Sequence, residues 1–99
     1  MEKIVVHVDA DLEDLIPGYL QNRHQDVESV LQAVDKHDFE TIRVLGHTMK
    51  GTGGGYGFDA ITEMGRTLEE AAKSRDIAVI RQGAAALLAY LRAVEVVFQ

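Results

Sequence analysis

Apolar residues recur every three or four positions from residue 11 to the end of the chain, which is the spacing of one face of an α-helix. An aspartate precedes each main run, where its carboxylate can accept hydrogen bonds from the first backbone N–H groups of a helix. These predicted N-caps are Asp11, Asp38, Asp59 and Asp76. Amphipathic helices joined by short connections pack as antiparallel neighbours. The pattern therefore predicts an all-α fold, an antiparallel up-and-down four-helix bundle with an extra N-terminal segment.

The single proline and several glycines mark the bounds and contacts of these helices. Pro17 restarts or kinks the first helix, and the glycines between 53 and 57 end the helix that follows Asp38. The last helix is expected to run from Ile77 to Phe98. Gly46 lies on the core face of its helix, where a missing side chain permits close contact with a neighbouring helix.

The first residues differ from the rest of the chain. Residues 3–8 are rich in Val and Ile and read as extended, but one isolated strand cannot make a sheet. We therefore expect residues 1–10 to form an arm lying on the bundle. Residues 11–99 are expected to form a single helical domain, because a chain of this length has room for one hydrophobic core.

The composition narrows the class of protein. The net charge is −6, which disfavours nucleic acid as a partner because phosphate binding needs a basic face. The chain has no cysteine, so it has no thiol nucleophile and no Cys-ligated zinc, and it suits a reducing cytosol. No apolar run approaches the ~20 residues of a membrane span, and the apolar stretch near the start is too short for a signal peptide. We expect a cytoplasmic protein with neither nucleic acid nor membrane as a partner.

His47 stands out from the helical pattern. With about 100° between successive residues, the apolar residues of its helix gather on one side and His47 lies almost opposite. The apolar side consists of Phe39, Ile42, Leu45, Gly46 and Met49. The His47 side also carries Glu40, Arg43, Lys50, Gly51 and Gly54. We therefore predict a solvent-exposed imidazole in the middle of a helix.

Two neighbours of His47 suggest a chemical use for it. A helical side chain covers the turn before it, so a side chain at position 51 would roof the imidazole, and Gly51 leaves it open. Glycine inside a helix costs about 0.5–1 kcal/mol relative to alanine, so stability alone does not select it. Lys50 leans the same way and brings an ammonium group near the ring. Neutral imidazole is a nucleophile, and Lys50 can offset the charge of a phosphoryl group attached to it.

The segment from His47 to Phe58 resembles the signature of histidine-containing phosphotransfer (HPt) domains. The shared pattern is a histidine, an apolar residue two positions on, Lys then Gly, a turn of small residues, and a glycine near the next helix; here it reads HTMKGTGGGYGF. Residues 38–42 resemble the family's run-up to the histidine, and residues 68–72 resemble its next helix. The resemblance covers roughly residues 10–98.

This resemblance implies a function and a role for each site residue. His47 would accept and donate the phosphoryl group, Lys50 would stabilise its charge, and Gly51 would provide steric clearance. The implied protein is a phosphorelay carrier, which accepts the group from a receiver-domain aspartate or a kinase and passes it to a response-regulator receiver aspartate. The implied partners are receiver domains and sensor histidine kinases. The receiver would supply Mg²⁺, so we expect no metal site, no intrinsic cofactor and no independent catalytic turnover.

The roles of other residues near the histidine are less specifically indicated by the sequence. Arg43, Val44 and Gly54 are candidate partner contacts. Arg43 either steers an acidic pocket of the partner or is ordinary solvated surface, whereas Val44 offers an apolar contact. Glu69 and Glu70 are expected on a solvated face. A bundle with one accessible site fits a monomer.

Two other functions fit a helical bundle with an exposed histidine. The first is a protein-interaction module that is never phosphorylated, although a pure binder has no need of the Lys-Gly pair after the histidine. The second is the dimerisation helix pair of a sensor kinase. Such helices usually carry an acidic residue directly after the histidine and a proline five residues on, where this chain has Thr48 and Thr52.

Overall fold

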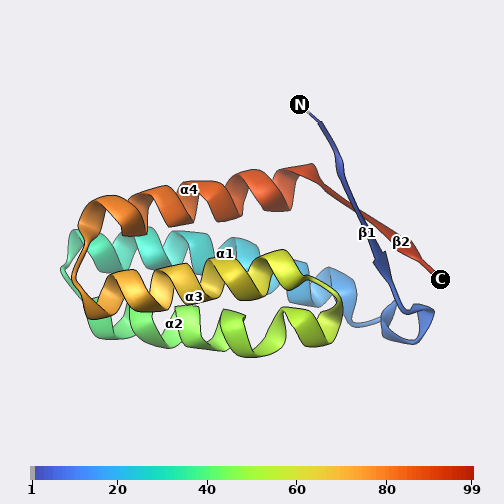
Figure 1. Ribbon diagram of the computed structural model, residues 1–99, viewed down its shortest axis with the longest axis horizontal. Helices are drawn as coiled ribbons and strands as arrows, with labels where there is room; N and C mark the ends of the chain where they lie inside the picture. Colours follow the sequence, from blue (N-terminus) through green and yellow to red (C-terminus); the bar gives the residue numbers. More distant parts are fainter. Residues whose placement is uncertain (1) are drawn as a thin grey trace.

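The computed structural model describes residues 2–99, and its four long helices form an antiparallel up-and-down bundle (Figure 1). The predicted bundle is confirmed. In chain order the elements are β1 (Ile4–Val8), a 3-10 turn η1 (Ala10–Leu12), α1 (Ile16–Asp35), α2 (Phe39–Thr52), a second 3-10 turn η2 (Gly54–Tyr56), α3 (Asp59–Lys73), α4 (Ile77–Ala93) and β2 (Val94–Phe98). Pro17 lies in the first turn of α1, where its missing N–H has no partner to lose.

Two of the four predicted helix caps are confirmed. The carboxylates of Asp38 and Asp76 each accept a hydrogen bond, 3.2 Å long, from the backbone N–H three residues on. Asp59 is not a cap but the first residue of α3, where a negative charge still favours the positive end of the helix. Asp11 is also not a cap, because it lies inside η1 and Asp9 accepts a hydrogen bond from its N–H.

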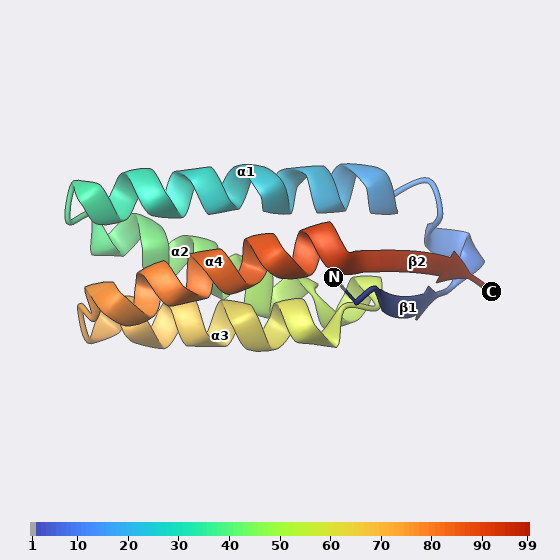
Figure 2. The ribbon, with the colours of Figure 1, turned by 90° about the horizontal axis from the view of Figure 1, so that it is seen from above.

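The two ends of the chain form a parallel ribbon (Figure 2). Ile4 pairs with Val94, and the register continues to Val8 and Phe98. The prediction that the last helix reaches residue 98 is therefore wrong, since α4 ends at Ala93. Valines at three of the next four positions favour an extended backbone, and the first strand supplies the partner that an isolated arm would lack.

The core lies between the four helices and reaches the inner face of the ribbon. Its largest fully buried side chains are Phe58, Ile16, Ile42, Met49, Ile61, Leu68, Ile80, Leu87, Val8, Val30 and Val34. The turn after α2 is held to the bundle by aromatic stacking, because the ring of Tyr19 lies 4.3 Å from Tyr56 and 5.9 Å from Phe58 between centroids. This anchor fixes where α2 ends and α3 begins.

Candidate functional site

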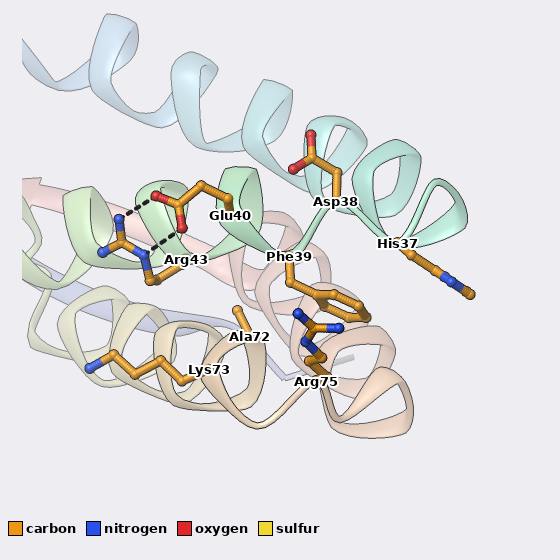
Figure 3. Close-up of a pocket in the computed structure, with 8 residues that line it drawn as sticks. All are labelled: His37, Asp38, Phe39, Glu40, Arg43, Ala72, Lys73 and Arg75. Carbon is orange, nitrogen blue, oxygen red and sulfur yellow. Dashed lines mark hydrogen bonds and ion pairs between the residues drawn. The ribbon is translucent and has the colours of Figure 1, made fainter.

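Polar side chains line a cleft beside the start of α2 (Figure 3). The cleft has a volume of about 410 Å³ and is lined by His37, Asp38, Phe39, Glu40, Arg43, Ala72, Lys73 and Arg75. His37 stacks on Phe39 with 5.9 Å between the rings, and the Arg75 guanidinium lies 5.6 Å from the same ring. Arg43 donates from Nε to Glu40 at 3.0 Å. Stacking leaves the ring nitrogens of His37 without a carboxylate partner in residues 2–99, so nothing in this cleft fixes which of them carries the proton.

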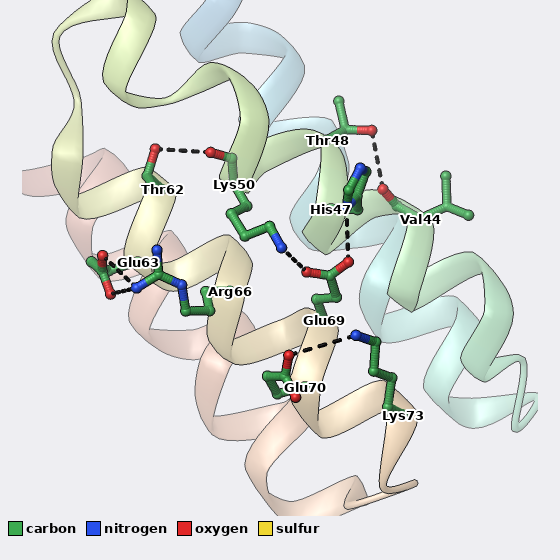
Figure 4. A network of polar contacts seen from close by, with 10 residues as sticks. All are labelled: Val44, His47, Thr48, Lys50, Thr62, Glu63, Arg66, Glu69, Glu70 and Lys73. Atoms are coloured by element: carbon green, nitrogen blue, oxygen red, sulfur yellow. Dashed lines mark hydrogen bonds and ion pairs between the residues drawn. The ribbon is translucent and has the colours of Figure 1, made fainter.

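His47 lies near the middle of α2, and 65% of its side chain is exposed. The prediction of a solvent-exposed imidazole in mid-helix is therefore confirmed. The opposite face of the helix is buried through Ile42, Gly46 and Met49. The ring is nevertheless held in place, because Nδ1 lies 2.8 Å from Oε2 of Glu69 on α3 (Figure 4).

Glu69 is buried, with 3% of its surface exposed, so the prediction that it lies on a solvated face is wrong. One carboxylate oxygen faces His47, and the other, Oε1, lies 2.6 Å from Nζ of Lys50. Glu70 is exposed, as predicted, and its carboxylate lies 3.6 Å from Nζ of Lys73. A buried carboxylate is costly unless it is paired, and two side chains of α2 supply the pairing.

Two glycines bring Glu69 beneath the histidine. A Cβ on Gly46 would lie 2.6 Å from the backbone N of Glu69, and a Cβ on Gly65 would lie 2.5 Å from the backbone N of Lys50. The close helix contact predicted at Gly46 is therefore confirmed. The sequence holds a signal for Glu69 too, since it stands on the buried stripe of α3, eight residues after Ile61 and four after Gly65. A carboxylate on such a stripe indicates a polar partner on the facing helix.

The carboxylate of Glu69 determines which nitrogen of His47 carries the proton. The hydrogen bond from Lys50 lowers the pKa of Glu69 to about 2; burial opposes this lowering, and the hydrogen bond from His47 adds to it. An ionised carboxylate only accepts hydrogen bonds, so Nδ1 of His47 is the protonated nitrogen. Nε2 then keeps its lone pair, and it points away from Glu69 (Figure 4).

Lys50 and Gly51 follow the histidine on the same helix. Nζ of Lys50 is already paired with Glu69, and one third of the side chain is exposed. Apart from the neighbouring backbone of its own helix, a Cβ on Gly51 would meet no atom within 4 Å, so the packing of this fold does not require glycine there. Gly46 and Gly51 thus differ in kind, because one permits helix contact and the other leaves open space on the surface.

The chain matches a known protein family over most of its length. The family described as the Hpt domain matches residues 11–96, which include all four helices. This chain belongs to the Hpt family. No curated protein and no solved structure matches it. Hpt domains take part in histidine phosphotransfer within phosphorelays, typically as intermediates without catalysis of their own, and they interact with receiver domains or kinases.

Two of the three predicted partner contacts of this Hpt domain lie in α2, and the third lies in the turn that follows it. Val44 is 48% exposed one turn before the histidine, and Arg43 beside it is paired with Glu40. Gly54 lies in η2, where its N–H donates to Oγ1 of Thr62 at 2.8 Å. The prediction that Gly54 shares the histidine's face of the helix is wrong, because α2 has ended before that residue.

Neither a metal site nor a membrane-spanning helix is found in the described residues of the Hpt domain. Within residues 2–99, no three His, Asp or Glu side chains are grouped so that they could hold a metal ion. Over the same range, no helix has both the length and the apolar character needed to cross a membrane. The chemistry available on the α2–α3 face is that of an imidazole, a carboxylate and an ammonium group.

Proposed function

We propose that His47 is the residue of this Hpt domain that carries the phosphoryl group, and that Nε2 is the atom to which it is bound. One observation carries the proposal: a buried carboxylate 2.8 Å from Nδ1 fixes the proton on that nitrogen and leaves the lone pair on the exposed one. The other histidines lack this arrangement in the described chain, where the His47–Glu69 pair is the one His–carboxylate contact.

The transfer forms one bond and breaks one. The lone pair of Nε2 attacks phosphorus, an N–P bond forms, and the P–O bond to the donor oxygen breaks with its electron pair leaving on that oxygen. The imidazole gains positive charge as the bond forms, and Glu69 at Nδ1 stabilises that charge without reorganisation. In the onward step a receiver carboxylate oxygen attacks phosphorus, and the N–P electron pair returns to Nε2.

Lys50 and Gly51 assist this step in the proposed function. The phosphoryl group brings negative charge beside Glu69, and Lys50 can then bond to both through its three N–H donors. Gly51 leaves open the surface over which the partner approaches, and exposed Val44 offers an apolar contact there. The donor is a receiver aspartate or a kinase, and the acceptor is a receiver aspartate. Mg²⁺ held by the receiver would supply the positive charge that offsets the transferred group.

A phosphotransfer assay tests this assignment. Receiver domains from the same genome are phosphorylated with a small-molecule donor and mixed with the wild-type chain, His47→Gln or His37→Gln. The last variant is a matched control, because His37 is an exposed histidine without a carboxylate partner. We expect an acid-labile, base-stable label on the wild type and on His37→Gln, and none on His47→Gln. A label that persists in His47→Gln contradicts the assignment. Absence of label from every active receiver would favour the unphosphorylated interaction module.

A further inference from the structure

The β1–β2 ribbon leaves one edge of β1 without a partner. The sheet described in residues 2–99 has two strands, so each strand bonds to the other on one side only. β1 reads IVVHV and lacks the proline, lysine or bulge that commonly protects an edge strand. Its surface is also apolar, since Val5 is 52% exposed. Such an edge is a template for a further strand.

The register shows which backbone groups face this open edge. Beyond the paired residues, Gln99 donates its N–H to the carbonyl of Val8 at 3.0 Å, and Ala10 donates its N–H to the carbonyl of Gln99 at 2.9 Å. The backbone groups of even-numbered residues therefore point toward β2. Because direction alternates along a strand, those of Val5 and His7 point to the open edge, and no backbone hydrogen bond of the described chain uses them outside the ladder.

We propose that the open edge of β1 pairs antiparallel with β1 of a second copy of this chain, with the two-fold axis at Val6. This pairing sets Val5 opposite His7 of the second copy, so that the outward backbone groups bond to each other. It also sets Lys3, whose Nζ lies 3.8 Å from Oε2 of Glu95 in its own chain, opposite Asp9 of the second copy, twice by symmetry. The result is a four-stranded sheet with β1 strands at its centre.

Other registers lack this charge complementarity. Moving the axis to Val5 sets Lys3 opposite His7 of the second copy, and moving it to His7 sets the two copies of that histidine against each other. An axis between residues sets outward backbone groups opposite inward ones, which breaks the ladder. The edge of β2 offers no charge pair, because Glu95 is the one charged residue of that strand.

The pairing defines how the two bundles lie. β2 continues beyond the end of α4 (Figures 1 and 2), while the side chains of Val6 and Val8 pack against the core. A two-fold rotation at Val6 reverses the direction of the second bundle along the strands and leaves both bundles on the face of the sheet to which these two side chains point. His47 lies in the middle of α2, so both copies keep it accessible. The proposed dimer differs from the monomer expected from the sequence, and it does not rest on the proposed phosphotransfer.

A single cysteine tests the position of the axis, because the chain contains none of its own. Opposed residues at the axis form a pair whose Cα atoms lie about 4.5 Å apart, within reach of a disulfide. We expect Val6→Cys to form a covalent dimer under mild oxidation. The control is Val97→Cys on β2, because Val97 is more exposed than Val6. If disulfides formed only by random collision, this control would cross-link faster than Val6→Cys. Faster cross-linking of the control, or none in Val6→Cys, overturns the proposal.

Charge exchange tests the register independently. In sedimentation experiments over a dilution series, we expect the wild type to reach twice the chain's 10.9 kDa. Lys3→Glu and Asp9→Lys should each remain monomeric, because each sets like charges opposite one another at both ends of the pairing. An equimolar mixture of the two variants should dimerise, since every facing pair is then opposite in charge. Circular dichroism verifies that both variants keep their helices. A wild type that is monomeric at every concentration, or a mixture that does not associate, overturns the proposal.

Discussion

The α2–α3 pair and the α1–α4 pair of this bundle are held together by different means. Along α2 and α3 the backbones touch at Gly46 and Gly65, and polar side chains fill part of the contact. The α1–α4 side of the core is built from buried aliphatic side chains, such as Val30 and Leu87, neither of which is exposed. The first arrangement places polar atoms accurately, whereas the second removes apolar surface from water.

The difference separates two kinds of sensitivity. A change among aliphatic side chains alters the free energy of unfolding but leaves the polar atoms on the other side of the bundle where they are. A change at the glycine contact moves α3 relative to α2 and shifts Glu69 from the imidazole. Substitutions on the α1–α4 side should therefore change stability alone, whereas substitutions at the α2–α3 contact should also change the rate of phosphoryl transfer.

The largest effect on stability is expected from Leu87→Ala in α4. Truncating a buried leucine costs about 2–5 kcal/mol, depending on how far the cavity collapses. Urea denaturation measures this loss. The rate of phosphoryl acceptance per folded molecule should stay at the wild-type value, because Leu87 lies on the other side of the core. A rate that falls with stability would show that the two helix pairs are not separate.

Glu69→Gln should slow phosphoryl acceptance roughly 10- to 100-fold. Hydrogen bonds to charged groups contribute about 1.5–3 kcal/mol, and each 1.36 kcal/mol of barrier is about tenfold in rate. A neutral amide neither stabilises the charged imidazole nor requires the proton on Nδ1. Glu70→Gln is the matched control, because it removes the neighbouring exposed carboxylate. Equal rates in the two variants would contradict the role of Glu69.

Comparison of the wild type with Glu69→Gln also predicts how the free energy of unfolding depends on pH. The pKa of Glu69 is lowered from 4.5 to about 2 in the folded chain, so its contribution to stability is present above the higher value. That contribution is lost as the pH falls between these two values. We expect the wild type to lose more stability than Glu69→Gln over this interval in urea denaturation. Parallel curves would show that the carboxylate contributes nothing.

Gly65→Ala should destabilise the fold by about 1–3 kcal/mol through overpacking. The added Cβ would lie 2.6 Å from the carbonyl oxygen of Gly46, and a backbone atom cannot yield as a flexible side chain can. Phosphoryl acceptance should fall as well, because the helices separate at the level of the site. Thermal unfolding and the transfer assay together check both effects. If Gly65→Ala kept both the wild-type stability and the wild-type transfer rate, α3 could shift relative to α2 without affecting either.

Gly51→Ala should have the smallest effect on the free energy of unfolding, and it should stabilise the fold where the other substitutions destabilise it. The added methyl group enters open space, so relief of the glycine cost should stabilise the fold by about 0.5–1 kcal/mol. Gly51→Leu should keep the fold but block transfer, because the longer side chain leans over the imidazole. Thermal unfolding and transfer rates measure both variants. Undiminished transfer in Gly51→Leu would show that position 51 does not need to be open.

Local features of the bundle could be predicted from the sequence. The helical period, the caps at Asp38 and Asp76 and the exposure of His47 all depend on residues within a few positions of one another. The cap predicted at Asp59 is displaced by one residue, since Phe58 occupies that position without a capping side chain. The cap predicted at Asp11 differs more, because a 3-10 turn precedes α1 and Leu15 stands at its N-cap.

Features that depend on distant residues could not be predicted in the same way. The charge of Glu69 predicts a solvent-exposed position, but its burial depends on Lys50 and His47 of another helix. The sequence predicts too late an end for α4, because Val94 and Phe98 continue its apolar pattern. Their extended conformation depends on a strand at the other end of the chain. In both cases the deciding partner lies outside the local pattern.

The residues of the site are close along the chain, whereas those of the ribbon stand at its two ends. His47 and Glu69 belong to a helical hairpin closed by one short turn, but the ribbon brings Ile4 beside Val94. Closing a longer loop costs more conformational entropy, and non-local pairings slow folding. We therefore expect the hairpin to assemble before the ribbon closes, so that the imidazole reaches its carboxylate before the two ends of the chain meet.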